Sequence, residues 1–247
     1  ESLAFGEGVD IADLVVSNCG LLNSVDVSHL AGLEKLRLSA LGEGFTQLDL
    51  SSNTQLKSLS LSLLNSGFTQ LDLSGLTQLE SLALGGGGFE DLDLSHQALL
   101  SDLRIDGAGA LTSLDLSAQH ALGSVWVNGA GNLASLTFAA DAPLTEIYVS
   151  GTGLTQLEIP QTAALASLSV GDNQLSELVI PEGSRQTLES LTAYGNKLKS
   201  LDLNGMSLDG CLLVAAGGED LRPQTPVFEG AEQKNGSVVV DLSSIAD

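Results

Sequence analysis

A short apolar pattern that returns at nearly constant intervals constrains this chain more than any other feature. An apolar-x-apolar triplet, preceded by an apolar residue three positions earlier, recurs every 10 to 13 residues along most of the 247-residue sequence. The triplets start at Leu14, Val25, Leu36, Leu48, Leu59, Leu71, Leu82, Leu92, Leu103, Leu114, Val125, Leu136, Ile147, Leu157, Leu168, Leu178, Leu191 and Leu201. Such self-similarity is typical of a repeat architecture, in which each copy is stabilised by packing on its neighbours.

Alternate triplets differ in kind, so the true unit is about 22 residues long and occurs nine times. One set reads LDL in many units, whereas the other reads LVV, LRL, LSL or LAL. Successive residues of an extended chain point to opposite faces, so each triplet predicts a very short strand with its middle residue outward. Units stacked about 4.8 Å apart would align their leucines into one core. Before Gly205 no segment has a sustained helical period, and almost no helix is expected.

Two segments match the leucine-rich repeat consensus at every position, LASLSVGDNQL over 165–175 and LESLTAYGNKL over 188–198. The chain therefore resembles leucine-rich repeat proteins over about 11–203. Its LDLS strands are similar to those of bacterial internalin-like and Bacteroidetes-type surface proteins. The resemblance implies a right-handed superhelix that is secreted or displayed on a bacterial cell surface and acts in adhesion or host interaction.

The consensus asparagine of the leucine-rich repeat is present in only two units, as Asn173 and Asn196. The other units carry different residues there, namely Cys19, Leu41, Leu64, Gly87, Ala108, Ala130 and Thr152. A hydrogen-bonded asparagine ladder is therefore expected only toward the C-terminal end. At the same position of the first unit, Cys19 is expected to be buried and unreactive.

Short strands on both faces predict a nearly straight solenoid, because strand spacing is the same on the two sides. In three consecutive units Phe45, Phe68 and Phe89 replace the leucine that precedes LDL, and we expect these rings to stack in the core.

The repeat predicts one solenoid domain over 1–204, with an N-terminal edge at about 1–10. Residues 205–247 are expected to form a C-terminal cap over the exposed core, or else to begin a following domain. Within them MSLDGCLLVAAGG favours a short helix with Leu208, Leu212 and Leu213 inward, and GSVVVDLSS over 236–244 has strand character.

The charge balance argues against two classes of partner. Nine Lys and Arg against 31 Asp and Glu give a net charge of −22, which would repel nucleic acid and anionic lipid. No apolar run approaches the roughly 18 residues of a membrane-spanning helix.

Cys19 and Cys211 would lie about 40 Å apart along the stack, too far for a disulfide. A monomer is expected.

The LDLS carboxylates form an outward row at one aspartate per unit, Asp26, Asp49, Asp72, Asp93, Asp115 and Asp202. Like charges about 5 Å apart repel, so the row must be relieved by solvent, by raised pKa values or by cations. Two interpretations follow. The row is either a calcium or basic-peptide track, or a solvated face that opposes aggregation.

Other candidate chemistry is weak. The glycine runs at Gly85 and Gly107 recur at the repeat period without the Lys and Ser or Thr of a phosphate loop, so they predict turns. The three histidines, His29, His96 and His120, do not predict a converging zinc site. We find no pattern typical of an enzyme, and no metal or cofactor is expected.

The second strand set carries the most distinctive outward residues. Its middle positions read Val15, Arg37, Ser60, Ala83, Arg104, Trp126, Tyr148, Ser169 and Thr192. Because Arg104, Trp126 and Tyr148 are 22 residues apart, they are expected to stack as a ladder suited to cation–π and aromatic contacts. Polar residues on the same face surround the ladder, Asp102, Asp106, Ser124, Asn128, Glu146 and Ser150, and Tyr194 adds an aromatic side chain two rungs beyond.

These residues lead to a functional expectation. Exposed aromatic rings among carboxylates and amides are typical of surfaces that recognise a protein or a glycan. The sequence therefore predicts a non-catalytic extracellular binding protein that uses this sheet. Two alternatives stay open: the ladder only stabilises the sheet, or the chain is a structural spacer that displays another domain.

Overall fold

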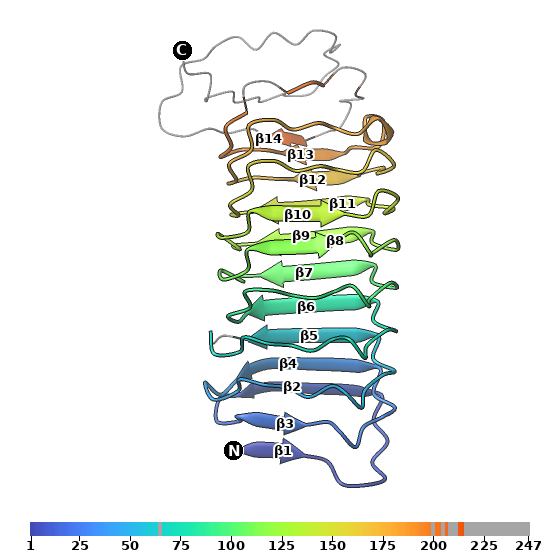
Figure 1. Cartoon of the computed structure of the whole chain (residues 1–247), viewed down its shortest axis with the longest axis vertical. Helices are drawn as coiled ribbons and strands as arrows, with labels where there is room; N and C mark the ends of the chain where they lie inside the picture. Colours follow the sequence, from blue (N-terminus) through green and yellow to red (C-terminus); the bar gives the residue numbers. More distant parts are fainter. Residues whose placement is uncertain (64–65, 199–200, 204–205, 207–211, 215–247) are drawn as a thin grey trace.

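The protein is a stack of parallel rungs along one axis (Figure 1). This computed structural model describes residues 1–63, 66–198, 201–203, 206 and 212–214. The stack is nearly straight, with β1 at one end and β14 at the other. Helix is confined in these residues to one short 3-10 turn, η1 (Glu182–Ser184), so the predicted β-solenoid with almost no helix is confirmed. No helix in these residues is long and apolar enough to cross a membrane.

One side of the stack, which we call the sheet face, is a single parallel sheet of 10 strands. The strands are arranged across the sheet in the order in which they occur along the chain, and paired residues are about one repeat apart, as for Leu36 and Leu59. The strands are β2 (Asp13–Cys19), β4 (Lys35–Leu41), β5 (Ser58–Leu63), β6 (Ser81–Gly86), β7 (Asp102–Asp106), β9 (Ser124–Asn128), β11 (Glu146–Ser150), β12 (Ser167–Ser169), β13 (Ser190–Thr192) and β14 (Leu212–Val214).

The opposite side, the outer face, carries the LDL set of triplets. In the described residues its strands form two separate parallel pairs, β1 (Ser2–Ala4) with β3 (Ser24–Asp26), and β8 (Ser113–Leu116) with β10 (Ser135–Phe138). The other LDL triplets, such as 48–50 and 71–73, are not hydrogen-bonded into a ladder. Strands on both faces are therefore present, with continuous pairing on the sheet face alone.

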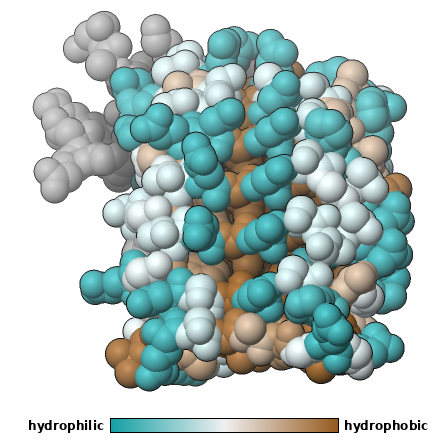
Figure 2. Space-filling view, turned by 60° about the horizontal axis from the view of Figure 1, so that its bottom comes forward, coloured by the Kyte–Doolittle hydropathy of each residue, from teal (hydrophilic) through white to brown (hydrophobic). Residues whose placement is uncertain are grey.

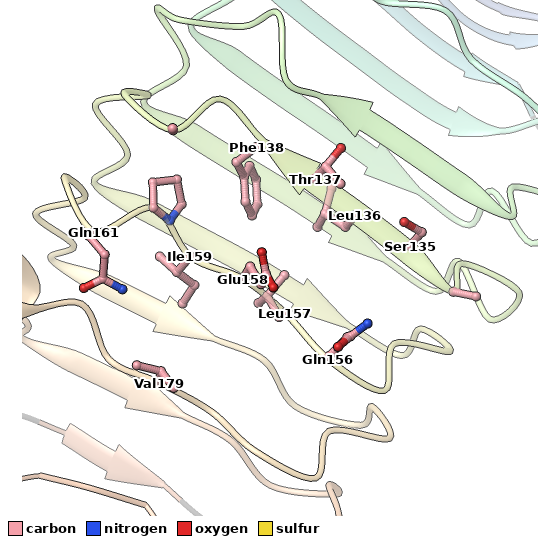
Figure 3. Close-up of a pocket in the computed structure, with 13 residues that line it drawn as sticks. Ser135, Leu136, Thr137, Phe138, Gln156, Leu157, Glu158, Ile159, Gln161 and Val179 are labelled. Carbon is pink, nitrogen blue, oxygen red and sulfur yellow. The ribbon is translucent and has the colours of Figure 1, made fainter.

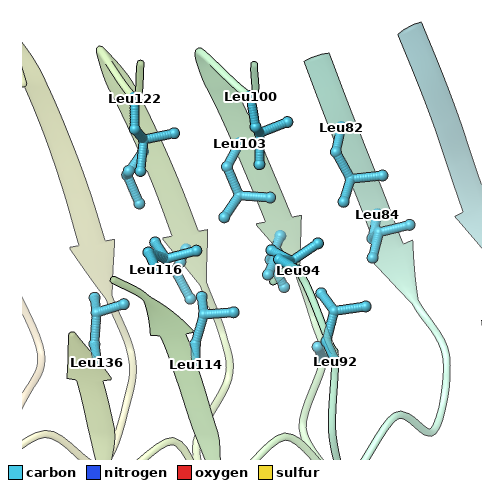
Figure 4. Close-up of a cluster of buried hydrophobic side chains, with 14 of the residues drawn as sticks. Leu82, Leu84, Leu92, Leu94, Leu100, Leu103, Leu114, Leu116, Leu122 and Leu136 are labelled. Carbon is cyan, nitrogen blue, oxygen red and sulfur yellow. The ribbon is translucent and has the colours of Figure 1, made fainter. Parts of the chain in front are cut away.

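The core lies between the two faces and runs the length of the stack. Figure 4 shows leucines of both faces pointing toward one another, among them Leu82 and Leu103 from the sheet face and Leu94 and Leu116 from the outer face. The predicted phenylalanine stack is confirmed, since the ring centroids of Phe45 and Phe68 are 5.7 Å apart and those of Phe68 and Phe89 are also 5.7 Å apart.

Buried amides satisfy backbone groups at the turns. Asn173 Nδ2 donates to the carbonyls of Val149 and Val170, and Asn196 repeats this pattern one unit later, as the sequence predicts for the C-terminal end. A second set was not predicted. Fully buried amides at the turn after LDLS, those of Asn53, Gln97 and Gln119, donate to backbone carbonyls of the preceding unit.

Two expectations about the ends are wrong. Leu212–Val214 is strand β14 and not part of a helix, because it pairs with Ser190–Thr192 at the repeat spacing and so adds one more rung. Cys19 is exposed rather than buried. It lies on β2, the first strand of this sheet, and the described residues include no rung of the sheet beyond β2 that would cover it. The rest of the expected cap and Cys211 lie outside the described residues.

Candidate functional site

The register of the sheet brings the predicted ladder together. Trp126 on β9 pairs with Arg104 on β7 and with Tyr148 on β11. The Arg104 guanidinium carbon lies 4.6 Å from the centroid of the Trp126 ring. On the other side, the Trp126 and Tyr148 centroids are 4.7 Å apart with 31° between the ring planes. Parallel strands place equivalent side chains in line, so this ladder follows directly from the repeat length.

Carboxylates accept hydrogen bonds from polar side chains in and around the ladder. Asp106 accepts hydrogen bonds from Arg104 at 3.2 Å and from Asn128 at 2.9 Å. Ser124 and Glu146 approach to 3.5 Å across β9 and β11. Asp102 is exposed at the start of β7. Arg104 is thus held in place over Trp126 by Asp106, while half of its side-chain surface, 50%, stays exposed.

The three side chains of the ladder cover part of one another's surface. Trp126 lies between Arg104 and Tyr148, so a ligand would meet the edge of the indole and not its faces. The side of Tyr148 toward β12 adjoins the small Ser169, its register partner. Trp126 Nε1 is buried and has no hydrogen-bond partner within the described residues. Such unsatisfied groups are rare in folded proteins and call for an explanation.

Tyr194 is not part of this cluster. It follows β13 and its ring lies across Gly171, where an added Cβ would come within 2.8 Å of the ring. The stacked contacts that define the ladder join Arg104, Trp126 and Tyr148, and Tyr194 makes no such contact with them within the described structure. Tyr194 is half-buried and remains a separate aromatic at the C-terminal side of the sheet face.

The aspartate row on the outer face has a structural explanation. Each of Asp26, Asp49, Asp72, Asp93 and Asp115 accepts the backbone N–H of the serine two residues later, at 2.9 to 3.0 Å. This Asx turn ends the LDL triplet. The hydroxyl and the N–H of the following serine together lower the pKa of Asp26, Asp49, Asp72 and Asp93, although Asp26 and Asp72 raise that of Asp49 by repulsion. For Asp115 the Thr137 hydroxyl is the largest cause of the lowered pKa, followed by Ser117. Raised pKa values therefore do not relieve the row.

The other motifs are structural as well. Gly107, Gly129 and Gly151 follow the ends of equivalent strands with φ of 68°, 67° and 64°, a backbone conformation that favours glycine, so the turns predicted there are confirmed. The turn predicted at Gly85 is wrong, because Gly85 and Gly86 are the last two residues of β6 and the chain leaves the strand at Gly87. His120 Nδ1 contacts the Asp141 carboxylate at 2.5 Å, and that contact lowers the pKa of Asp141. Within the described part of the chain no group of His, Cys, Asp or Glu could hold a metal ion.

The surface repeats as regularly as the core. Viewed with the N-terminal end forward, Figure 2 shows residues of like hydropathy in columns along the stack, with a hydrophobic column between hydrophilic ones. On such a surface, a candidate binding site is a group of adjacent rungs at which the side chains of one column differ in chemical character from the rest of that column. On the sheet face that change occurs at Arg104, Trp126 and Tyr148, within a column otherwise made mostly of small residues.

Comparison with solved structures identifies the architecture. The functional domain of InlJ from Listeria monocytogenes is 24% identical and superposes with a TM-score of 0.57, over 64% of this chain and 34% of that chain. The chain has the leucine-rich repeat fold. InlJ's domain includes a cysteine ladder. This chain has two cysteines in all, so its repeat cannot form one.

Two further structures are similar at lower scores. An internalin of Listeria monocytogenes, InlF, is 20% identical with a TM-score of 0.36, over 92% of this chain and 88% of that chain. A leucine-rich repeat protein of Leptospira interrogans is 17% identical with a TM-score of 0.35, over 79% and 66% of the two chains. No family model and no curated protein matches the sequence.

Proposed function

We propose that this leucine-rich repeat chain is a non-catalytic binding protein, secreted or displayed on a cell surface, that holds a protein or glycan partner on its sheet face. The observation that carries the proposal is the ladder of Arg104, Trp126 and Tyr148, in which a guanidinium and two aromatic rings stack across β7, β9 and β11 on an open surface. Tyr, Trp and Arg are the residues that most often dominate binding energy at interfaces.

The surroundings of the ladder support recognition. On either side of it the same outward column carries small residues, Ala83 on β6 and Ser169 on β12, so the three large side chains are grouped on adjacent rungs. Asp106, Asn128 and Glu146 add hydrogen-bonding groups at its margin. An apolar projection with a polar margin is the usual anatomy of a small recognition surface. The structural similarity to internalins is consistent with a role in adhesion. That similarity is one of fold alone.

A structural spacer is the second candidate, favoured by the straight stack of Figure 1. Ten strands at about 4.8 Å give a rod of roughly 45 Å, with the two described ends at opposite poles. A spacer needs no ladder of partly exposed aromatic rings, and it predicts that no ligand saturates the sheet face.

Arrays of glycans and of extracellular-matrix proteins, probed with the purified chain and with Trp126→Ala, separate these candidates. We expect binding to a small set of array members that Trp126→Ala abolishes. Thr192→Ala, which changes the same column away from the ladder, is the matched control and should retain binding. Equal signals from all three proteins would overturn the sheet-face proposal, and the absence of any saturable ligand would favour the spacer.

A further inference from the structure

A groove of about 750 Å³ opens on the outer face between β10 and the segment 157–159 (Figure 3). Leu136 and Leu157 in its lining are only 6% and 7% exposed. Leucines of the outer face are more exposed in other rungs, for example Leu48 and Leu71, which are half-buried. The groove thus reflects the spacing of rungs on the outer face and not a specific site. The sheet face carries the more distinctive chemistry.

On the sheet face, the rung of β12 lies beside an open face of an aromatic ring. Trp126 packs on one face of the Tyr148 ring, with centroids 4.7 Å apart, so the opposite face is directed toward β12. The residue that β12 places there is Ser169, whose side chain is too short to cover a ring. Because strands stack about 4.8 Å apart, a flat ring lying over Ser169 would meet Tyr148 at the distance at which Trp126 meets it on the other side.

Tyr194 borders the same place from the other direction. It follows β13, and its ring reaches back over Gly171, two residues after Ser169. An added Cβ at Gly171 would lie 2.8 to 3.2 Å from three carbons of this ring. One face of the Tyr194 ring therefore rests on the glycine, and the other is directed outward. Tyr148 and Tyr194 thus border β12 on two sides.

The surface between the two rings carries hydroxyl groups. They belong to half-buried outward residues of β12 and β13, namely Ser167, Ser169, Ser190 and Thr192. Within the described residues these four hydroxyls make no hydrogen bond to the protein, and each can donate one and accept two. Glu146 is exposed on β11 beside Ser167 and adds a carboxylate acceptor. Free hydroxyls also occur at Ser60 on β5, but no aromatic ring lies on the strands paired with it.

The charges around β12 favour a neutral ligand. The strands β11, β12 and β13 contain no Lys, Arg or His. Glu146 on β11 and Asp172 after β12 are acidic and exposed, and the whole chain has a net charge of −22. Arg104 is three rungs from Ser169 and is already paired with Asp106. A sulfated or carboxylated ligand would therefore be repelled here.

We propose that the rung of β12, between Tyr148 and Tyr194, binds a neutral pyranose unit of a glycan that stacks on the free face of Tyr148 above Ser169. A pyranose has an apolar face of C–H bonds and a rim of hydroxyls, so its face matches the ring and its rim matches the serine, threonine and carboxylate groups. An aromatic side chain of a protein partner would fit the same space but would leave those polar groups without partners. This inference rests on the proposed binding role of the sheet face and names the ligand class.

A glycan array tests the proposal with neutral oligosaccharides of glucose, galactose and N-acetylglucosamine, printed beside sulfated and sialylated forms of the same chains. We expect neutral members to bind and their acidic forms to bind at least about tenfold more weakly. Ser169→Leu fills the space beside Tyr148 and should weaken binding by at least about tenfold. Ala83→Leu is the matched control and should retain binding, because Ala83 lies in the same column beside Arg104. Thermal melts establish that both variants are folded.

Saturation-transfer difference NMR with the neutral oligosaccharide that gives the strongest array signal reports the stacking directly. Irradiation of aromatic protons of the protein should transfer saturation mainly to C–H protons on the ring of one sugar unit. Tyr148→Ala should remove this transfer, and Tyr194→Ala should reduce it. Transfer that Tyr148→Ala leaves unchanged would contradict stacking on this ring.

The outcomes separate this inference from the sheet-face proposal. Binding that Trp126→Ala abolishes and Ser169→Leu retains, or binding to matrix proteins and to no glycan, would overturn the pyranose site and leave the sheet-face proposal standing. Equal losses for Ser169→Leu and Ala83→Leu would also overturn it, because the ligand would then lie across the whole ladder. Preference for the sulfated or sialylated forms would overturn the neutral class. The absence of any saturable ligand on glycan and matrix arrays would overturn both proposals.

Discussion

Trp126 and Tyr148 pack against each other across β9 and β11, with 4.7 Å between their ring centroids and a tilt of 31°, and Arg104 covers the opposite side of the indole. Three side chains that are separated by 22 residues each thus form one continuous surface. An aromatic pair contributes about 0.5–1.5 kcal/mol beyond the area that it buries. This modest contribution makes it possible to separate a stabilising role from a binding role.

Trp126→Ala should reduce the free energy of unfolding by about 1–2 kcal/mol, because it removes one stacked pair and one cation–π contact at a half-exposed position. The same substitution should abolish binding of any sheet-face ligand. Chemical denaturation measures the first effect and the array experiment measures the second. A loss above about 4 kcal/mol with binding intact would identify the ladder as a purely stabilising feature.

The aspartate row makes stability depend on pH in a defined direction. Hydrogen bonds from the following serines hold the pKa of Asp49 and Asp72 below their ordinary value of 3.8. A carboxyl with a lowered folded-state pKa stabilises the protein above its unfolded-state pKa, and this contribution is lost as pH falls through the folded-state value. The melting temperature should therefore fall as pH drops below about 4.

The double variant Asp49→Asn and Asp72→Asn isolates this effect, because the amide oxygen can still accept the serine N–H but the side chain no longer titrates. Its melting temperature should depend less on pH below about 4 than that of wild type. Carboxyl carbon chemical shifts followed by NMR give the individual pKa values. Values above the ordinary one would mean that repulsion along the row outweighs the serine hydrogen bonds.

Calcium should not stabilise the row. Each carboxylate already accepts its own turn hydrogen bonds, and no group of acidic side chains among the described residues converges as a metal site. Calcium at millimolar concentration and a chelator should give the same melting temperature by calorimetry. A rise with calcium that the Asp49→Asn and Asp72→Asn variant lacks would restore the cation-track interpretation.

Cys19 should be chemically accessible. It is exposed on the outermost strand of the sheet, and its Sγ is 3.3 Å from the Ser17 carbonyl oxygen. Iodoacetamide under native conditions should alkylate Cys19, as detected by peptide mass spectrometry, and protection until the protein is unfolded would contradict the exposed position. Cys19→Ser should change the melting temperature little, because the thiol fills no space in the core.

The repeat length predicts most of the fold, because a strand period of 22 residues decides which residues become neighbours. For the same reason it predicts the contacts of Trp126 with Arg104 and Tyr148 before any coordinates exist. It does not predict the buried position of Gln97, because the turn after LDLS carries Asn, Leu or Gln in different units and amide burial depends on the exact turn geometry.

The two sets of buried amides should differ in their energetic importance. Asn173 is 1% exposed, accepts the Thr152 N–H and donates to the carbonyls of Val149 and Val170. Asn173→Ala leaves these backbone groups without partners, and we expect it to cost about 3 kcal/mol of unfolding free energy. Gln97 makes one such bond, to the Leu73 carbonyl, while its own Oε1 has no partner in the described structure.

Gln97→Leu is the matched comparison, because Leu76 occupies the equivalent position of the preceding unit and is 1% exposed there. This substitution removes an unsatisfied buried oxygen together with the one hydrogen bond, so its cost should be below about 1 kcal/mol. Urea denaturation of both variants measures the difference. Equal losses would mean that both amides act mainly by filling space, and a larger loss for Gln97→Leu would show that the outer turn and not the asparagine ladder determines the stability of the stack.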